Sequence, residues 1–436
     1  MSNNMNVKRS TMDIITERVE VVDKLKQILI HRLNLDCSPD EITHDAILFG
    51  SGIGLDSIDA LQLISTIESE FEVTLPQDQS AILRSVNTIA DFIIDVRHKE
   101  KTFSGVFIEE HADSSLLEKD TPYYAIRNEI ACINYNDLAI YRIQLVERSL
   151  EKLNQFLSNK ITKLTENNMQ QSLILDNNSP YLRILAYVEL YHCGDHLLLL
   201  INNENKHIIT EFYPEAIEES EQYDLFSIEG PKSHSVISQI IGTNAIGLKL
   251  HMHVLSEVDS YYLRTAHLSR TGETGFLFFS SKIYTSSLLQ KIEAIIEHKL
   301  IRVDDKTQRL LQMESCEIGF DLSLIIPNHE CPFSAGLNWM IDLSKYPNSK
   351  YHTDKKLILI RGQKGDMNHC VNDKLFIDNQ MIGYISACDF SLVLQKIIGY
   401  AYVDSSCAFP GVITDDNIQF VSAPFVLAKS LKTVGE

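Results

Sequence analysis

One serine lies in a setting that suits covalent modification of its hydroxyl group. Ser57 follows Asp56 at the start of a run in which apolar residues recur at nearly helical spacing as far as Phe71. We therefore predict a helix that begins near Ser57 and exposes its hydroxyl at the first turn. A hydroxyl flanked by acidic residues is a suitable target for a modifying enzyme with a basic docking face. The alternative is a purely structural serine at a helix start.

The segment around this serine resembles the acyl and peptidyl carrier family. Asp56-Ser57-Ile58 is similar to its D-S-[IL] motif, and residues 48–64 continue the pattern. In that family the serine bears 4'-phosphopantetheine, so the resemblance implies a covalent arm on Ser57. It also implies partners: a phosphopantetheinyl transferase, an acyl- or aminoacyl-loading enzyme and other enzymes of a biosynthetic pathway. A carrier holds its group as a thioester and raises the effective concentration of that group at partner sites.

Neighbouring segments supply the other helices of an all-α, four-helix carrier bundle over residues 1–97. The loop 36–54 is polar and glycine-rich, as a long connection requires. Downstream, Asn87 or Thr88 is expected to cap the last helix. Upstream, one helical stripe is formed by Val22, Leu25, Leu29 and Leu33.

The composition limits the class of protein. At 436 residues the chain is long enough for two or three compact units. Its net charge of −20 argues against binding to nucleic acid or to anionic membrane surfaces. The chain has no apolar run long enough to span a bilayer and no signal-peptide core at its start. Its eight cysteines are scattered without a CxxC pair, which predicts reduced thiols and a cytoplasmic protein.

The pattern changes twice along the chain. Residues 98–121 are charged and small, which is typical of a linker. Residues 122–350 mix strand and helix patterns and predict an α+β domain. Residues 351–436 carry short strands and crowded turn signals, which favour a small β-barrel.

Several segments of this second part, in order, resemble the glycine-cleavage T-protein (aminomethyltransferase) family. Residues 183–191 are similar to its G-R-I-x-x-D-x-x-V strand, and residues 268–276 to its Y-T-G-E-D-G-F turn. The remaining matches are 317–320, 331–339 with Asp342, 382–391, 396–403 and 423–425. The resemblance implies an aminomethyltransferase-like α+β fold with a C-terminal barrel. It also implies one-carbon transfer with tetrahydrofolate in a central cavity, where a carboxylate assists the folate amine.

Three polar positions of that family differ in this chain. Tyr187 stands at the aspartate of the strand motif, Leu277 at the glutamate after the turn, and Ser315 at an arginine before the E-A-G match. None of the three can carry the charge it replaces. The folate site has therefore either degenerated into a scaffold or kept its function with a relocated acid.

Four residues are candidates for a surviving site. Glu189 is the candidate catalytic acid, because a strand period of two puts it on the same face as Tyr187. Tyr187, Glu273 and Trp339 are candidate cofactor-binding residues. Each has a simpler alternative: a solvent-facing strand glutamate for Glu189, an exposed or structural turn residue for Glu273, and core packing for Trp339.

No metal site is expected. The pairs His192 with His196 and His251 with His253 lack a third ligand at a recognisable spacing. Two functions remain open for the whole chain. It is either a carrier that presents a tethered group for folate-dependent one-carbon transfer, or a non-enzymatic carrier whose second domain recruits partner enzymes.

Overall fold

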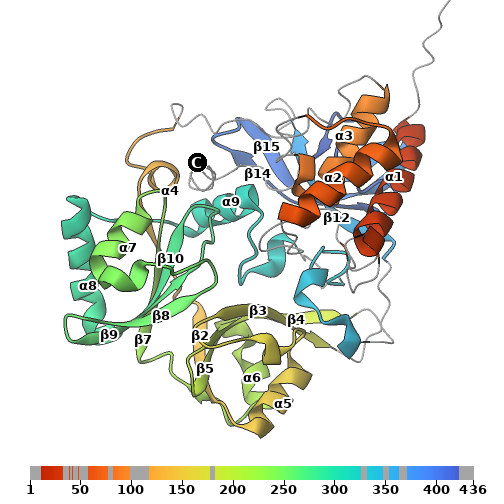
Figure 1. Ribbon diagram of the computed structural model, residues 1–436. Helices are drawn as coiled ribbons and strands as arrows, with labels where there is room; N and C mark the ends of the chain where they lie inside the picture. Colours follow the sequence, from red (N-terminus) through yellow and green to blue (C-terminus); the bar gives the residue numbers. More distant parts are fainter. Residues whose placement is uncertain are drawn as a thin grey trace, which may run out of the picture.

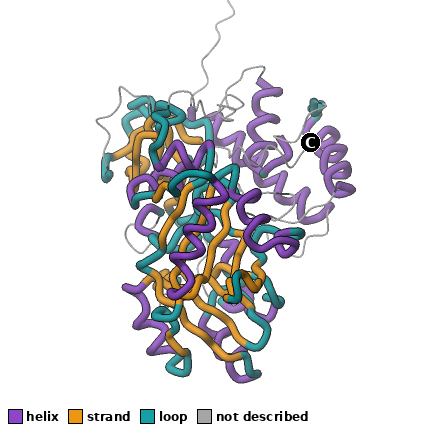
Figure 2. The backbone as a smooth tube through the Cα atoms, turned by 90° about the vertical axis from the view of Figure 1, so that its left-hand side faces the viewer, coloured by secondary structure: helices purple, strands orange, loops and turns teal. Residues whose placement is uncertain are grey.

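The computed structural model (Figure 1) describes residues 11–32, 39, 42, 48, 57–76, 82–98, 117–176, 182–325, 331–346, 353–362 and 371–421. The side chains of residues 11–14, 57–59, 84 and 324 are outside this description. So are most of the loop 36–54, linker residues 99–116 and the last motif match, 423–425. In Figure 2 the helices of the N-terminal domain lie to one side of a strand-rich remainder.

The N-terminal domain is a helical bundle, as the sequence predicts. Its main described elements are α1 (Thr11–Arg32), α2 (Ser57–Phe71), the 3-10 turn η2 (Ile82–Arg84) and α3 (Val86–His98). Their apolar stripes meet in one core, in which Leu25, Leu29 and Ile67 are fully buried. The predicted helical carrier bundle is thereby confirmed, and so are Val22, Leu25 and Leu29 of the predicted stripe on α1; Leu33 lies outside the described residues.

The predicted cap of the last helix is wrong by two or three residues. Ser85, not Asn87 or Thr88, precedes the first turn of α3. The backbone N–H of Thr88 donates to Ser85 Oγ (3.3 Å), and the N–H of Ser85 donates to Thr88 Oγ1 (2.8 Å). This reciprocal pair satisfies two backbone donors at the start of α3, so the helix begins where both hydroxyls can take part.

Two of the three described sheets in the second part pack against each other through a shared apolar core. The six-stranded sheet has the order β11-β1-β7-β10-β9-β8, and α7 (Ser233–Ile241) and α8 (Lys282–Ile296) pack on it. Its strands are β1 (Ala131–Asn134), β7 (Tyr223–Glu229), β8 (His253–Val258), β9 (Tyr261–His267), β10 (Gly275–Ser281) and β11 (Ile301–Arg302). Only β1 and β11 pair in parallel among these described strands.

The five-stranded sheet β3-β4-β5-β2-β6 is antiparallel and is covered by α5 (Glu147–Phe156) and α6 (Lys206–Phe212). Its strands are β2 (Leu138–Gln144), β3 (Met169–Asp176), β4 (Arg183–His192), β5 (His196–Asn202) and β6 (Ile217–Glu218). Side chains on both faces of β5 are almost fully buried, one face against α5 and α6 and the other against the six-stranded sheet, which explains its nearly unbroken apolar sequence.

The C-terminal sheet is a half-barrel with the order β13-β14-β15-β12-β16. Its strands are β12 (Lys355–Gly362), β13 (Lys374–Ile377), β14 (Gln380–Ser391), β15 (Lys396–Asp404) and β16 (Gln419–Val421). The other described helical elements of this part are α4 (Pro122–Asn128), α9 (Asp305–Ser315) and the 3-10 turns η5 (Ile161–Lys163), η6 (Asn203–Asn205), η7 (Gly242–Ala245), η8 (Leu322–Leu324), η9 (Asn338–Met340) and η10 (Leu343–Lys345). The predicted α+β domain with a C-terminal barrel-like sheet is confirmed.

The carrier bundle is docked on this half-barrel, and the two are drawn side by side in Figure 1. Ile15 of α1 is buried in the core that the barrel strands form. Arg18 is 1% exposed, and its Cζ lies 5.0 Å from the centre of the Phe409 ring. Its Nε donates to Asp91 Oδ1 (3.0 Å) and its Nη2 donates to Asn87 Oδ1 (3.1 Å), both on α3. One arginine therefore joins two carrier helices to the barrel.

Two further properties of the described residues bear on function. No helix among them is both long enough and apolar enough to cross a bilayer. The six cysteines that the structure covers, Cys132, Cys193, Cys316, Cys331, Cys388 and Cys407, are thiols.

Candidate functional site

The first candidate site is the start of α2 in the carrier bundle. This helix begins at Ser57, as predicted. Buried Leu63 and Ile67 hold it against the core of the bundle. The backbone N–H groups at a helix start favour a phosphate group, so a phosphodiester on Ser57 fits this position. The exposure of the hydroxyl remains a prediction.

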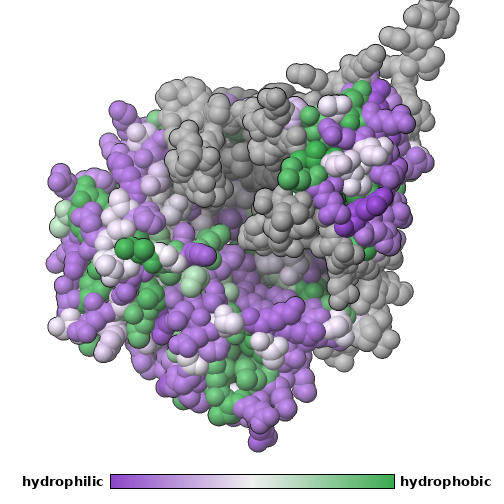
Figure 3. Space-filling model, in the orientation of Figure 1, coloured by the Kyte–Doolittle hydropathy of each residue, from purple (hydrophilic) through white to green (hydrophobic). Residues whose placement is uncertain are grey.

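The second candidate site is a cavity of about 710 Å³ in the aminomethyltransferase-like part. Its wall combines the end of β1, the start of β4, the turn after β5, the loop between β9 and β10, helix α9 and the segment 320–323. Such a volume is typical of a pocket for a small molecule or cofactor. The face of the molecule in Figure 3 is hollowed near its centre and is largely hydrophilic there.

Arg270 is the one charged side chain of this wall that is buried, among the residues that the structure describes. Its Nη2 donates to Glu189 Oε2 at 2.7 Å. Two aromatic rings of the same wall flank the guanidinium, with Cζ 5.1 Å from the ring centre of Tyr135 and 4.9 Å from that of Phe320. The cation is therefore held in place by both charge and packing.

Glu189, the candidate catalytic acid, is completely buried and does not line the cavity. Besides the ion pair with Arg270, its Oε1 accepts from the hydroxyl of Tyr187 (3.0 Å) and its Oε2 from that of Tyr191 (2.8 Å). The strand period correctly places Tyr187 and Glu189 on one face of β4. The solvent-facing alternative for Glu189 is wrong, because this face of β4 packs against the centre of the molecule.

A second buried carboxylate, that of Glu229 at the end of β7, orders the loop that carries Arg270. Its Oε2 accepts from the backbone N–H of Arg270 (3.0 Å) and from Thr271 Oγ1 (2.7 Å). Its Oε1 accepts from Ser227 Oγ (2.9 Å) and the hydroxyl of Tyr135 (3.4 Å). Through these bonds the side chain of Glu229 links Tyr135 to Arg270, two residues of the cavity wall.

The electrostatics of this cluster set its protonation states. Burial and the nearby Glu189 charge raise the pKa of Tyr187 and Tyr191 well above the usual value. Burial opposes the charge on Arg270, but the charge and hydrogen bond of Glu189, together with Tyr135 and Tyr187, outweigh it and raise the arginine pKa. Burial also raises the pKa of Glu229, against the hydrogen bonds that it accepts. At neutral pH the cavity wall therefore presents protonated tyrosines and a charged guanidinium.

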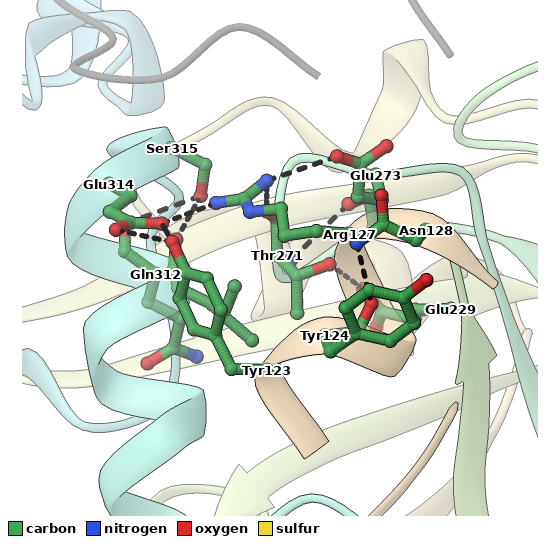
Figure 4. A network of polar contacts seen from close by, with 12 residues as sticks. Tyr123, Tyr124, Arg127, Asn128, Glu229, Thr271, Glu273, Gln312, Glu314 and Ser315 are labelled. Atoms are coloured by element: carbon green, nitrogen blue, oxygen red, sulfur yellow. Dashed lines mark hydrogen bonds and ion pairs between the residues drawn. The ribbon is translucent and has the colours of Figure 1, made fainter. Parts of the chain in front are cut away.

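Glu273, a candidate cofactor-binding residue, belongs to a separate buried network (Figure 4). Arg127 of α4 donates through Nη1 to Glu273 Oε1 (3.1 Å) and through Nη2 to Glu314 Oε2 on α9 (2.6 Å). The hydroxyl of Tyr123 donates to Glu314 at 2.7 Å, and Ser391 of the half-barrel donates to it at 2.6 Å. Glu273 is 1% exposed and is outside the cavity wall. It is a structural turn residue, and the exposed alternative is wrong.

The other sequence candidates separate in space. Tyr187 lines the cavity, as expected for its position in the motif. Trp339 lies on η9, is 54% exposed and is not part of the cavity wall, so the expectation that it packs in a core is wrong.

Ser315 contacts the turn of the Y-T-G-E-D-G-F match, where Gly272 has a φ of +79° and a Cβ would lie 2.6 Å from Ser315 Cβ. Only a glycine fits there without strain.

The cavity residue that the sequence candidates omit is Arg270. It occupies the tyrosine position of the Y-T-G-E-D-G-F turn, so this departure from the motif was the available signal. The resemblance implies tetrahydrofolate, and the volume of the cavity suits such a molecule. None of the described wall residues is a buried carboxylate, however. The residues present do not fit the acid role of that family.

The described histidine pairs do not gather a metal site. No group of three His, Cys, Asp or Glu side chains suited to a metal ion occurs among the residues covered by the structure. His253 instead packs beside Tyr191, and its Nδ1 accepts from Arg264 Nη1 at 2.9 Å.

The comparisons with known proteins agree with the division into two parts. Residues 23–93 match the family described as phosphopantetheine attachment site. The acyl carrier protein of Sulfurovum sp. (strain NBC37-1) is 32% identical over 74 residues, which are 17% of this chain and 95% of that protein. The N-terminal domain belongs to the acyl carrier family. Ser57 lies within the matched residues, and its role as the attachment serine remains a prediction.

The larger part is similar to aminomethyltransferases. The aminomethyltransferase of Halothermothrix orenii is 22% identical over 323 residues, covering 68% of this chain and 86% of that protein. The glycine cleavage system aminomethyltransferase T from Bartonella henselae superposes with a TM-score of 0.58 at 16% identity, over 70% of this chain and 89% of that one. At this identity the likeness shows a common fold. The acyl carrier domain is thus fused to an aminomethyltransferase-like domain.

Proposed function

We propose that the protein is an acyl or aminoacyl carrier with 4'-phosphopantetheine on Ser57, and that its second domain binds the tethered group in the central cavity without transferring a one-carbon unit. The observation that carries the second half is the position of Glu189. Both of its oxygens accept hydrogen bonds from buried partners, so no carboxylate of that strand faces a ligand in the cavity. A relocated acid therefore has no support there.

A phosphopantetheine arm and a cavity in the same chain can act together as a tether and its binding site. A group tethered in the same chain reaches the cavity as an intramolecular ligand, at an effective concentration that a free ligand does not reach. Binding in a pocket would shield the thioester from water until a partner enzyme collects the group. A phosphopantetheinyl transferase and a loading enzyme are the partners that this cycle needs.

The attachment is tested by loading the protein with coenzyme A and a phosphopantetheinyl transferase. The Ser57 oxygen forms a bond to the β-phosphorus of coenzyme A, the pyrophosphate bond breaks, adenosine 3',5'-bisphosphate leaves and the hydroxyl proton passes to solvent. We expect intact-mass measurement to show one added arm on the wild type and none on Ser57→Ala. The control is Ser65→Ala, an exposed serine on the same helix, which should load as the wild type does. An arm on Ser57→Ala would exclude this attachment site.

The rival function is tetrahydrofolate-dependent one-carbon transfer on the tethered group. The retained cavity and the 323-residue match to an aminomethyltransferase favour it. Equilibrium dialysis against tetrahydrofolate separates the two proposals. We expect no saturable binding to the wild type and no change in Glu189→Gln. Saturable binding, followed by transfer of a one-carbon unit to a loaded Ser57 arm, would establish the rival instead.

A further inference from the structure

Arg270 has hydrogen-bonding capacity that no described protein group uses. Its side chain is about 2% exposed, and only Nη2 has a partner, Glu189. The Nε and Nη1 atoms of Arg270 are buried without a hydrogen-bond acceptor. Buried donors of a charged group are normally satisfied, because an unmade hydrogen bond in the interior is costly. Since Arg270 belongs to the cavity wall, the missing acceptor belongs in the cavity.

The charged side chains of the cavity wall differ in how deeply they are buried. Its acidic residues, Asp137, Glu204, Asp305 and Asp321, are all exposed to solvent, where water and salt screen them. Arg309 is also largely exposed and pairs with Asp321 at 3.7 Å. Arg270 is buried between aromatic rings, so its field is screened least. A ligand that enters the cavity therefore meets at its inner wall a guanidinium that is ion-paired with Glu189 through Nη2 and keeps the N–H groups of Nε and Nη1 for an acceptor.

This arrangement reverses the charge that the related motifs carry. The strand motif has an acid where this chain has Tyr187, and the segment after the turn has an acid where it has Leu277. The turn motif begins with a tyrosine where this chain has Arg270. A site with carboxylates favours a protonated amine, whereas a guanidinium favours a carboxylate or another oxyanion.

We propose that the cavity binds a carboxylate-bearing acyl group, whose free carboxylate accepts hydrogen bonds from the unpartnered N–H groups of Arg270. The proposal rests on the proposed function in one respect: the group arrives on the Ser57 arm. Tyr135 and Phe320 pack against the guanidinium and orient it, and Glu189 keeps it from turning away. A dicarboxylic acid held as a monothioester is the simplest cargo of this class.

Three synthetic thioesters of nearly equal size test the selectivity: succinyl-, butyryl- and 4-aminobutyryl-pantetheine, with free succinate as a fourth probe. Titration calorimetry on the full unmodified chain should give at least tenfold tighter binding of succinyl-pantetheine than of the neutral and cationic thioesters. Free succinate should bind more weakly than succinyl-pantetheine if the site is built for a tethered group. Equal binding by succinate would assign the site to a free dicarboxylate instead and contradict the tethered cargo.

The role of Arg270 is tested in the same assay. Arg270→Gln should bind the succinyl and butyryl thioesters equally, and Arg302→Gln, an exposed arginine of β11 outside the cavity wall, should keep the wild-type preference. Because Arg270→Gln leaves Glu189 without its cation, the double variant Arg270→Gln/Glu189→Gln is measured beside it. Equal affinities for the three thioesters in the wild type, no binding of any of them, or a preference that survives in both Arg270 variants would overturn the proposal. None of these outcomes depends on Ser57, so a failure of this proposal can be told apart from a failure of the attachment experiment.

Discussion

Arg127→Met is expected to lower the free energy of unfolding of the aminomethyltransferase-like domain by about 3–5 kcal/mol. The arginine is 2% exposed and pairs with two buried carboxylates, those of Glu273 and Glu314. Removing it takes away the cation with which both carboxylates pair in the interior, and methionine fills the space but supplies no donor. Urea denaturation, followed by circular dichroism, measures the change.

Two controls separate this effect from a general loss of an arginine. Arg309→Met breaks a pair with Asp321 that is about half exposed on both sides, and the expected loss is at most about 1 kcal/mol. The triple variant Arg127→Met/Glu273→Gln/Glu314→Gln removes the stranded charges and should recover part of the stability. Equal losses of unfolding free energy in Arg127→Met and Arg309→Met would show that the buried network contributes no more to stability than an exposed ion pair does.

Arg18→Met is expected to destabilise the carrier bundle by a similar amount, about 3–5 kcal/mol, and to loosen it from the half-barrel. Asp91, which is 0% exposed, would lose the cation that it now pairs with, and Phe409 would lose the guanidinium beside its ring. Hydrogen–deuterium exchange should accelerate in α1 and α3 and around residue 409.

The matched control for this variant is Lys24→Met on the same helix. Lys24 pairs with Glu70 at 3.1 Å, but both side chains are more than a third exposed, so little change is expected. Arg18→Met/Asp91→Asn should recover protection in α3, because no buried charge remains unpaired. Unchanged exchange in α1 after Arg18→Met would show that the carrier does not depend on this contact.

Much of the fold could be predicted from local patterns. Apolar periodicity located α2 and the stripe of α1, because each of these helices turns one face to the core of the bundle. The cap of α3 was misplaced, since several neighbouring hydroxyl residues can each accept a backbone N–H. Backbone geometry selected Ser85 among them.

The candidate site was predicted less completely, and Glu189 shows why. The strand period placed it beside Tyr187, and the hydroxyl of Tyr187 does donate to it. Periodicity does not tell which of the two faces of a strand meets solvent, so the exposed alternative could not be excluded. Trp339 illustrates the converse: a large aromatic side chain favours a core, but here it lies on an exposed 3-10 turn.

Local sequence patterns are enough to predict a serine at the first residue of a carrier helix and the order of motifs that fold into an aminomethyltransferase-like domain. Which charged side chains meet depends on the packing of the folded chain. Arg270 and Glu189 are 81 residues apart in the chain and 2.7 Å apart in space, and Arg18 and Asp91 are separated by 73 residues. Such pairs depend on how sheets and helices pack, because the free energy of a buried charge is set by its three-dimensional surroundings and not by its sequence neighbours.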